Sequence, residues 1–423
     1  MQNGLPMNWD CKLKDLHINM LADYAGASGM KKKKFKKFTK IWTVIYIISF
    51  AAFQHIIIKA NILPIKLLVT IDTILVLLSI LLCIQLFSKH VKIWAKVFAT
   101  VLSTILIVAY TLGTVYGHKT LSFLENVSRT DNKKAVEITE KPFNIYITGM
   151  DTYGTIDMKG RSDVNMIVTV NPKTRKILLT SIPRDYEINL KKHDDAIDKL
   201  THTGFYGVDD TLTSVEDLLD IKLNYYIKVN FTTVDKFIDA IGGITVYSDY
   251  EFKTGNYGHG EKPVHIVKGE NKLDGPSALA FARERHAFKD GDNQRVKNQQ
   301  KVFQAVIEKG LKNKKVIMRY TKALDALQPY FRMNISSDEI RALVKLQLQY
   351  NLDDKNWTIE KNYLEGHDSF KNTYSGSNAY VMSPDKESIA NAKKKIKDVM
   401  NPPKKGKNKS NKNSDPEAEE PVD

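Results

Sequence analysis

The chain has 423 residues, a formal net charge of +15 at neutral pH and only two cysteines. Cys11 lies near the amino end and Cys83 lies in an apolar stretch. The rest of the chain has no cysteine, which excludes a disulfide-stabilised domain and thiol catalysis there. The excess of Lys and Arg favours anionic lipids and anionic polymers as partners.

Residues 1–40 precede the first apolar stretch. The segment MKKKKFKKFTKIW begins at Met30 and has the form of a natural start of a membrane protein. We therefore expect a leader and basic segment over 1–40. Within it, residues 1–29 are either not native or a short leader without assigned structure.

Three apolar stretches follow, over residues 41–58, 63–87 and 97–116, each close to the ~20 residues that cross a bilayer. Hydropathy favours membrane spans over the alternative of three buried helices in a soluble domain. Asp72 lies within the second stretch, where a carboxylate is either a functional group or, as we favour, a helix-packing contact. The sequence thus predicts three transmembrane helices over 41–116.

Lysines set the expected orientation. A run of lysines precedes the first span, and Lys89, Lys92 and Lys96 lie between the second and third, whereas the loop at 59–64 carries little charge. By the positive-inside rule, the amino end and the second loop are cytoplasmic. The chain after about Gly117 is then extracellular, and the protein is a three-span protein of the cell membrane.

The extracellular part reads as a short linker (117–141), one domain (142–400) and a disordered charged tail (401–423). Runs rich in β-branched and aromatic residues predict strands at 143–148, 164–170, 177–182, 225–231 and 244–247, the second and third forming a hairpin. Helical spacing predicts helices at 208–219, 233–241, 293–311 and 336–348. This alternation predicts an α/β fold, a three-layer α/β/α domain with a mixed central sheet.

Two arginine-rich regions carry the candidate site. The first contains GMD, GRSD and SIPRD, and the second contains AFARERH followed by DGDNQR and a Gln pair. A single arginine is usually a surface residue or an ion-pair partner, so only the joint occurrence is informative. Guanidinium groups bind phosphate oxygens bidentately, and carboxylates hold a metal that bridges them, so the pattern suits a pyrophosphate site.

Spacing indicates how the first region assembles. Asp151 follows the first predicted strand and Arg184 follows the third, where ligand sites of α/β sheets gather. Arg161 and Asp163 are two residues apart at a strand start, which would place both side chains on one face.

The second region depends on two helices. Arg283 and Arg285 would diverge on a continuous helix, so we predict that a helix over 276–282 ends there and the chain extends. Arg295 and Gln299 are four apart at the start of the next helix and share a face.

These motifs, with the continuous run LDGPSALAFARER, make the chain resemble the LytR-CpsA-Psr family of membrane-anchored cell-envelope proteins. The match runs from about residue 143 to 309, and more loosely to about 396. Some three-span relatives carry an accessory domain after the last span, for which residues 119–141 are too short.

The resemblance implies a phosphotransferase. It would attach a glycopolymer (teichoic acid, capsule or wall polysaccharide) from an undecaprenyl-pyrophosphate carrier to peptidoglycan, usually with Mg²⁺ (or Mn²⁺). Asp151 and Asp163 match the metal-holding carboxylates. The residues that match the pyrophosphate-facing group are Arg161, Arg184, Arg283, Arg285, Arg295 and Gln299. The residues that match the catalytic group are Arg184, Arg283, Arg285 and Asp163, and the general base stays open.

Two other classes stay open. The same arginines would also suit a pyrophosphatase acting on polyprenyl-pyrophosphate lipids, or a non-enzymatic envelope sensor or transcriptional attenuator. Direct DNA binding is disfavoured, because the short cytoplasmic parts carry no helix-turn-helix pattern. A lipid tail would need an apolar groove, for which the helices at 208–219 and 293–311 are candidate walls.

Overall fold

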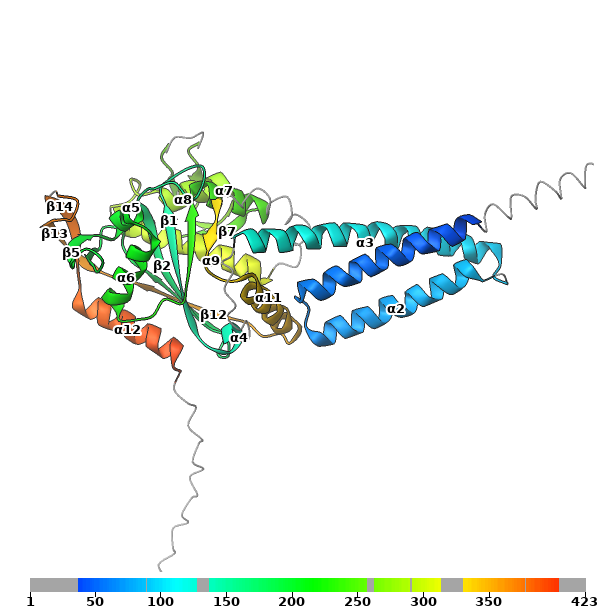
Figure 1. The fold of residues 1–423 in the computed structure, drawn as a ribbon. Coiled ribbons are helices and arrows are strands. Elements are labelled where there is room, and N and C mark those ends of the chain that lie inside the picture. Colours follow the sequence, from blue (N-terminus) through cyan, green and yellow to red (C-terminus); the bar gives the residue numbers. More distant parts are fainter. Residues whose placement is uncertain are drawn as a thin grey trace, which may run out of the picture.

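The computed structural model describes residues 37–88, 90–127, 137–256, 262–289, 291–312, 330–376 and 378–402 (Figure 1). The expectations for residues 1–29, and for the tail beyond residue 402, lie outside these ranges.

Three long apolar helices form the amino-terminal part: Lys37–Ala60, α2 (Ile65–Phe87) and α3 (Ile93–Val127). They pack on one another through a small cluster that includes Tyr46, Leu82 and Tyr110, while many other apolar side chains face outward. Apolar side chains that face outward suit a hydrocarbon environment. Each helix also satisfies the hydrogen bonds of its own backbone, as a membrane span must. Gln54 donates to Asp72 at 2.5 Å, which makes that carboxylate a helix-packing contact. The chain is a membrane protein with three spans.

Helix α3 is longer than a span. The membrane stretch was expected to end near residue 116, but the helix continues to Val127, so the range 117–141 begins as helix. Leu121, Phe123 and Leu124 are buried, and Phe123 and Leu124 belong to the core cluster of the following domain. Leu121 and Leu124 are three residues apart, a spacing that keeps them on one face.

The domain is built on a six-stranded sheet in the order β11-β6-β1-β2-β3-β12. Its strands are β1 (Phe143–Met150), β2 (Ser162–Asn171), β3 (Lys176–Ser181), β6 (Tyr225–Asn230), β11 (Arg332–Met333) and β12 (Thr358–Tyr363). β1–β2, β2–β3 and β6–β11 pair antiparallel, whereas β1–β6 and β3–β12 pair parallel. The mixed sheet and the β2–β3 hairpin are confirmed.

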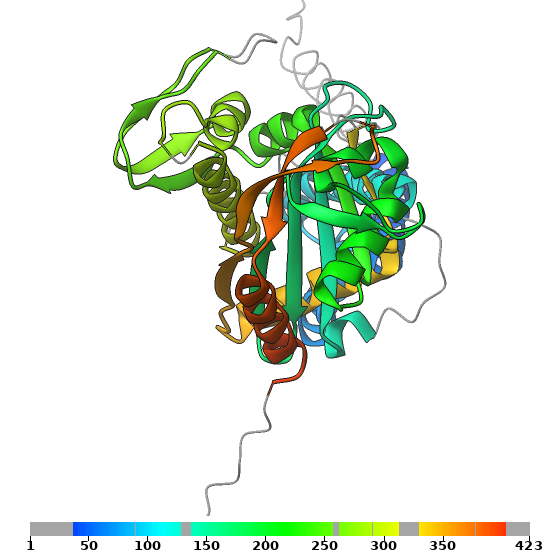
Figure 2. The same ribbon diagram turned by 90° about the vertical axis from the view of Figure 1, so that its left-hand side faces the viewer.

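Helices cover both faces of this sheet, as predicted. On one face, Ile147, Met166 and Leu179 pack with α3, α4 (Glu137–Glu140), α9 (Gly291–Lys312) and α11 (Ser337–Leu352). On the other, Tyr146 and Ile167 pack with α6 (Val208–Leu219) and α12 (Lys386–Met400), the side that faces the viewer in Figure 2. Neighbouring residues of a strand thus point to opposite faces.

The remaining elements are smaller. Helices α7 (Phe231–Ala240) and α8 (Gly275–Arg283) pack with α9 and with the β7–β10 pair in a third apolar cluster. The other elements are β4 (Glu187–Leu190), β5 (Ala196–Lys199), η1 (Leu200–His202), α5 (Thr203–Tyr206), β7 (Ile244–Ser248), β8 (Phe252–Lys253), β9 (His265–Ile266), β10 (Gly269–Leu273), β13 (Gly366–Asn372) and β14 (Asn378–Pro384). The strands β13 and β14 form a hairpin that the sequence did not indicate.

Candidate functional site

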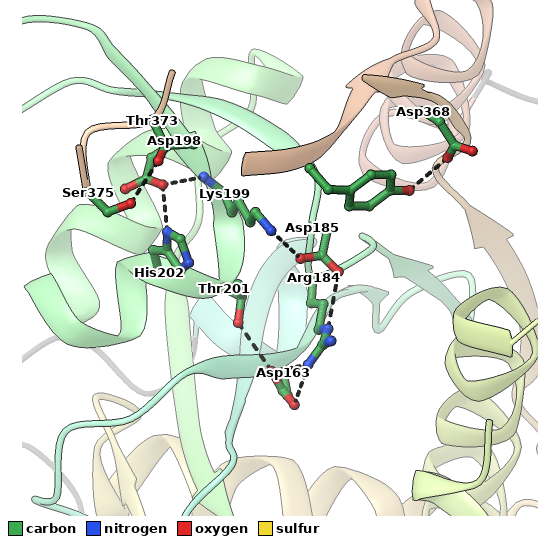
Figure 3. Close-up of polar contacts among 11 residues, drawn as sticks. Asp163, Arg184, Asp185, Asp198, Lys199, Thr201, His202, Asp368, Thr373 and Ser375 are labelled. Carbon is green, nitrogen blue, oxygen red and sulfur yellow. Dashed lines mark hydrogen bonds and ion pairs between the residues drawn. The ribbon is translucent and has the colours of Figure 1, made fainter. Parts of the chain in front are cut away.

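A β-bulge presents Asp163. Gly149 pairs with Val164 and Met150 pairs with Ser162, so Asp163 has no partner on β1. A bulge bends a strand and re-aims a side chain, so the regular alternation assumed for Arg161 and Asp163 does not hold here. Asp163 faces the loop after β3, where Arg184 Nη1 lies 3.1 and 3.2 Å from its two oxygens and Thr201 donates to it at 3.2 Å (Figure 3).

A buried polar network supports the bulge. Thr148 and Ser162 hydroxyls lie 2.6 Å apart, and Ser162 and Tyr146 donate to Asn165 Oδ1 at 2.7 and 2.5 Å. Asn165 closes the network by donating to the Ser162 carbonyl. Because a buried polar group without partners is costly, this network fixes the backbone on both sides of Asp163.

Asp151 lies beside this pair. Its Oδ1 accepts the Arg161 backbone N–H at 2.9 Å, while the Arg161 side chain is exposed. Burial and the negative charge of Asp163 raise the pKa of Asp151, and Arg161 and Arg184 oppose this shift. Two carboxylates that disfavour each other's charge are stabilised together by a cation.

The end of α8 places the next two arginines. Asp274 caps the helix by accepting the Ser277 N–H, and the chain leaves the helix after Arg283 with Glu284 in an extended conformation. The predicted helix end is therefore confirmed. Arg283 lies 4.3 Å over the Phe231 ring and donates to the Tyr153 hydroxyl at 2.8 Å. Arg285 Nε donates to the His286 ring at 3.3 Å.

The first turns of α9 carry the remaining predicted residues. Arg295 is buried and lines a small recess with Arg184, Asn293, Tyr380 and Met382, together with Pro183, Asp185 and Val296. One turn further, Gln299 lines a separate apolar cavity together with Arg283. The two residues are one helical turn apart, so the recess and the cavity lie along the same helix.

The apolar cavity has a volume of about 360 Å³ and lies between the sheet and helices α7, α8 and α9. Its walls include Ile147 and Met166 of the sheet, Val302 and Val306 of α9, and Phe123 from the end of α3. Helix α9, expected over 293–311, lines this cavity, whereas α6 (208–219) packs on the opposite face of the sheet and contributes nothing to the lining. Which helices hold a lipid tail stays a prediction.

The structure brings three further polar residues to the site. Lys199 Nζ lies 3.3 Å from Asp185 Oδ1, and Thr201 contacts Asp163 (Figure 3). Beneath them, Asp198 is fully buried and accepts from His202 Nδ1 at 2.7 Å and from the Tyr206 hydroxyl at 2.6 Å. The segment DKLTHTGFYG contains them, but its polar residues follow no period that would indicate a shared site.

The carboxylate pair suits a magnesium ion held jointly with a substrate. Within the ranges that the structure describes, no group of three or more His, Cys, Asp or Glu side chains is arranged to hold a metal ion by itself. Mg²⁺ commonly binds through one or two carboxylates, with substrate phosphates and water completing its shell. The raised pKa of Asp151 beside Asp163 is consistent with such a position.

A family model described as the LytR_cpsA_psr family matches residues 111–398. The polyisoprenyl-teichoic acid–peptidoglycan teichoic acid transferase TagU of Bacillus cereus strain AH820 is 36% identical over 224 residues, covering 53% of this chain and 69% of that protein. TagU of Bacillus licheniformis is 30% identical over 298 residues, covering 67% of this chain and 88% of that protein.

Among solved structures, Bacillus subtilis TagV superposes with a TM-score of 0.51 at 27% identity, over 62% of this chain and 98% of that one. The matched range of the family model includes the last part of α3, the whole six-stranded sheet and α9. This chain belongs to the LytR-CpsA-Psr family.

Proposed function

We propose that this protein is a membrane-anchored phosphotransferase that moves a glycopolymer from a polyprenyl-pyrophosphate carrier to peptidoglycan. The observation that carries the proposal is an apolar cavity with Arg283 and Gln299 in its lining. Gln299 lies one helical turn after Arg295, which lines the recess together with Arg184. A ligand with an apolar tail and an anionic head fits this arrangement. The named activity of the TagU relatives is of the same class.

The proposed site residues divide by position. Arg184, Arg283 and Arg295 would contact the pyrophosphate from different elements, with Gln299 beside them and Arg161 and Arg285 at the edge. Asp151 and Asp163 would hold Mg²⁺, which when bound neutralises charge on the phosphoryl oxygens. Chelation of divalent cations should slow turnover, and turnover that is indifferent to chelator would contradict this role.

The chemistry is a displacement at phosphorus. An acceptor hydroxyl attacks the phosphorus nearest the glycan, a new phosphodiester forms, and polyprenyl phosphate leaves with the electron pair of the broken P–O bond. The protein contributes mainly position and charge, because little covalent chemistry remains for it. A pre-organised cation in a shielded site supplies roughly 2–4 kcal/mol to such a transition state, by analogy with single hydrogen-bond donors.

We also propose the orientation in which the amino end is cytoplasmic and residues 142–400 form the extracellular catalytic domain. The lysines at the first span and in the second loop support it. In a chain whose native cysteines are replaced, Ser375→Cys should react with an impermeant maleimide on intact cells. His90→Cys should react only after permeabilisation, and the reverse pattern would contradict the orientation.

The function is tested with the full chain in detergent, a polyprenyl-pyrophosphoryl glycan, peptidoglycan oligomers and magnesium. Mass spectrometry of a covalent glycan–phosphate–peptidoglycan adduct would support the transferase. Free phosphorylated glycan without adduct would identify a pyrophosphatase instead, and unchanged lipid would favour a sensor.

A further inference from the structure

The β13–β14 hairpin forms one wall of the recess at the arginines. Tyr380 and Met382 of β14 line that recess together with Arg184 and Arg295. The hairpin is held against the same loop, because Met382 N–H donates to the Asp185 carbonyl at 2.8 Å and Ser383 donates to Glu187 at 2.5 Å. Its turn is held as well, through Tyr374 N–H and the Ile197 carbonyl. It is a fixed wall of the site.

Pairing register shows which hairpin side chains share a face with Tyr380. Phe370 lies opposite Tyr380, Asp368 opposite Met382, and Asn372 opposite Asn378. Directly paired residues point to the same face of a β-ribbon, and so do alternate residues along each strand. The face that enters the recess through Tyr380 and Met382 therefore continues outward with Phe370, Asp368 and the two asparagines.

The hairpin residues of this face are aromatic and polar and include no Lys or Arg. Lys199, whose Nζ lies 5.7 Å from the centroid of the Tyr380 ring, is paired with Asp185 at 3.3 Å. Phe370 is 68% exposed and packs edge-on against Tyr380, with ring centroids 6.0 Å apart, while the Tyr380 hydroxyl donates to Asp368 at 2.8 Å. Lys371 belongs to the other face by alternation. Exposed aromatic rings flanked by carboxylate and amide groups suit a sugar ring, which offers apolar C–H faces and hydroxyls.

The reaction geometry indicates which saccharide reaches this face. In a phosphoryl transfer, the attacking and leaving oxygens lie roughly in line on opposite sides of the phosphorus. Under the proposed function, the leaving polyprenyl phosphate belongs to the apolar cavity at Arg283. The acceptor hydroxyl must then approach from the other side of the arginines, where Arg184, Arg295 and Tyr380 line the recess.

Charge points to the same occupant. A polyanionic glycopolymer would be repelled by Asp368 and would find no lysine or arginine on this hairpin face. A neutral sugar of the peptidoglycan glycan strand meets no such repulsion. We propose that the hairpin face formed by Asp368, Phe370, Asn372, Asn378 and Tyr380 binds the acceptor saccharide and directs its hydroxyl to the arginine recess, an inference that rests on the proposed function.

The test is Phe370→Ala in the full chain in detergent, with initial rates measured while the peptidoglycan oligomer and the lipid donor are varied separately. The KM for the acceptor should rise about tenfold, because the ring that stacks on the sugar is lost, whereas the KM for the donor should stay within about twofold. Tyr247→Ala is the matched control, because Tyr247 is a 57% exposed aromatic on β7, outside the hairpin. It should change neither constant.

Binding without chemistry gives a second readout. Saturation-transfer NMR with peptidoglycan oligomers alone should show sugar signals for the wild-type chain and for Tyr247→Ala, and weaker signals for Phe370→Ala. An unchanged acceptor KM in Phe370→Ala, or a rise confined to the donor KM, would overturn the inference while leaving the transferase intact. A wild-type chain that forms no adduct would instead overturn the proposed function.

Discussion

At the scale of single residues, the site consists of charged side chains whose positions are fixed by their neighbours. Asp163 projects from a bulge that a buried network of hydroxyls and an amide keeps in shape, and Arg184 is oriented by ion pairs with Asp163 and Asp185. Arg283 is positioned by the Phe231 ring beneath its guanidinium and by the Tyr153 hydroxyl, to which it donates at 2.8 Å.

Arg283 gives the first prediction. Arg283→Ala should lower the turnover number about a hundredfold, since a single donor in a shielded site contributes roughly 2–4 kcal/mol to the transition state. Steady-state kinetics on the full chain measures this, with thermal unfolding as the check on folding. The control is Arg332→Ala. Arg332 lies on the edge strand β11 and pairs with Asp157, so its loss should leave turnover near the wild-type value. Near-wild-type turnover in Arg283→Ala would remove Arg283 from the site.

Asp198 gives a prediction about pH. Burial alone would raise the pKa of Asp198, but hydrogen bonds from His202, Tyr206 and the Lys199 N–H lower it below the usual value. A carboxyl whose folded-state pKa is depressed stabilises the fold above its unfolded-state pKa, about 3.9, and that stabilisation is lost as pH falls through the folded-state pKa.

Asp198→Asn should therefore lower the free energy of unfolding by about 1–3 kcal/mol at neutral pH, with the difference from wild type shrinking toward pH 3. Thermal unfolding of both chains in detergent across this range measures it. A difference that stayed constant with pH would show that the charge of Asp198 does not stabilise the fold.

At the scale of elements, α9 connects the two halves of the site. Its first turns carry Arg295 into the recess, and its middle lines the apolar cavity with Val302 and Val306. The bulge in β2 separates the two halves, because Val164 lines the cavity while the neighbouring Asp163 contacts Arg184.

Val306→Trp tests the cavity as the lipid site. The larger ring should occupy part of the volume and raise the KM for a long-chain polyprenyl donor about tenfold, because overpacking typically costs 1–3 kcal/mol. Leu218→Trp is the matched control on α6, on the opposite face of the sheet. It can lower stability but should leave the donor KM unchanged. An increase in donor KM for Leu218→Trp alone would move the lipid to the other face.

The elements that sequence patterns predicted are those with a strong period. Helix α6 matches its predicted bounds, and the β2–β3 hairpin follows from its turn and its apolar runs. The β13–β14 hairpin was missed because its strands are polar and partly exposed on both faces. The bulge at Asp163 was missed because it depends on pairing register, which a single strand's sequence does not contain.

At the scale of the whole molecule, the domain is attached to the membrane helices at more than one place. Helix α3 runs without a break from the span into the domain core, and Phe123 near its end lines the apolar cavity. Helix α11 lies against the end of the first span and the loop after it (Figure 1): Arg341 donates to the Lys59 carbonyl in the last turn of that helix at 2.9 Å, and Lys345 donates to Asn61 in the loop at 3.1 Å. The cavity is thereby held next to the ends of the membrane spans, where the lipid donor of the proposed function would enter.

No pattern in the sequence could have predicted these contacts between the domain and the membrane helices. The apolar stretches predicted the spans, but 117–127 is only moderately apolar, and its helical continuation depends on packing against the domain. The cavity itself is a volume left between helices α7, α8, α9 and the sheet, which residue periodicity does not report.

The most direct test of the account is the fate of the phosphorus nearest the glycan. A lipid donor labelled with ³²P at that position, incubated with the full chain, magnesium and peptidoglycan oligomers, should transfer the label into the peptidoglycan adduct and release unlabelled polyprenyl phosphate. Label that remains with the polyprenyl product, or appears only in free phosphorylated glycan, would contradict a transfer in which the acceptor attacks opposite the lipid cavity.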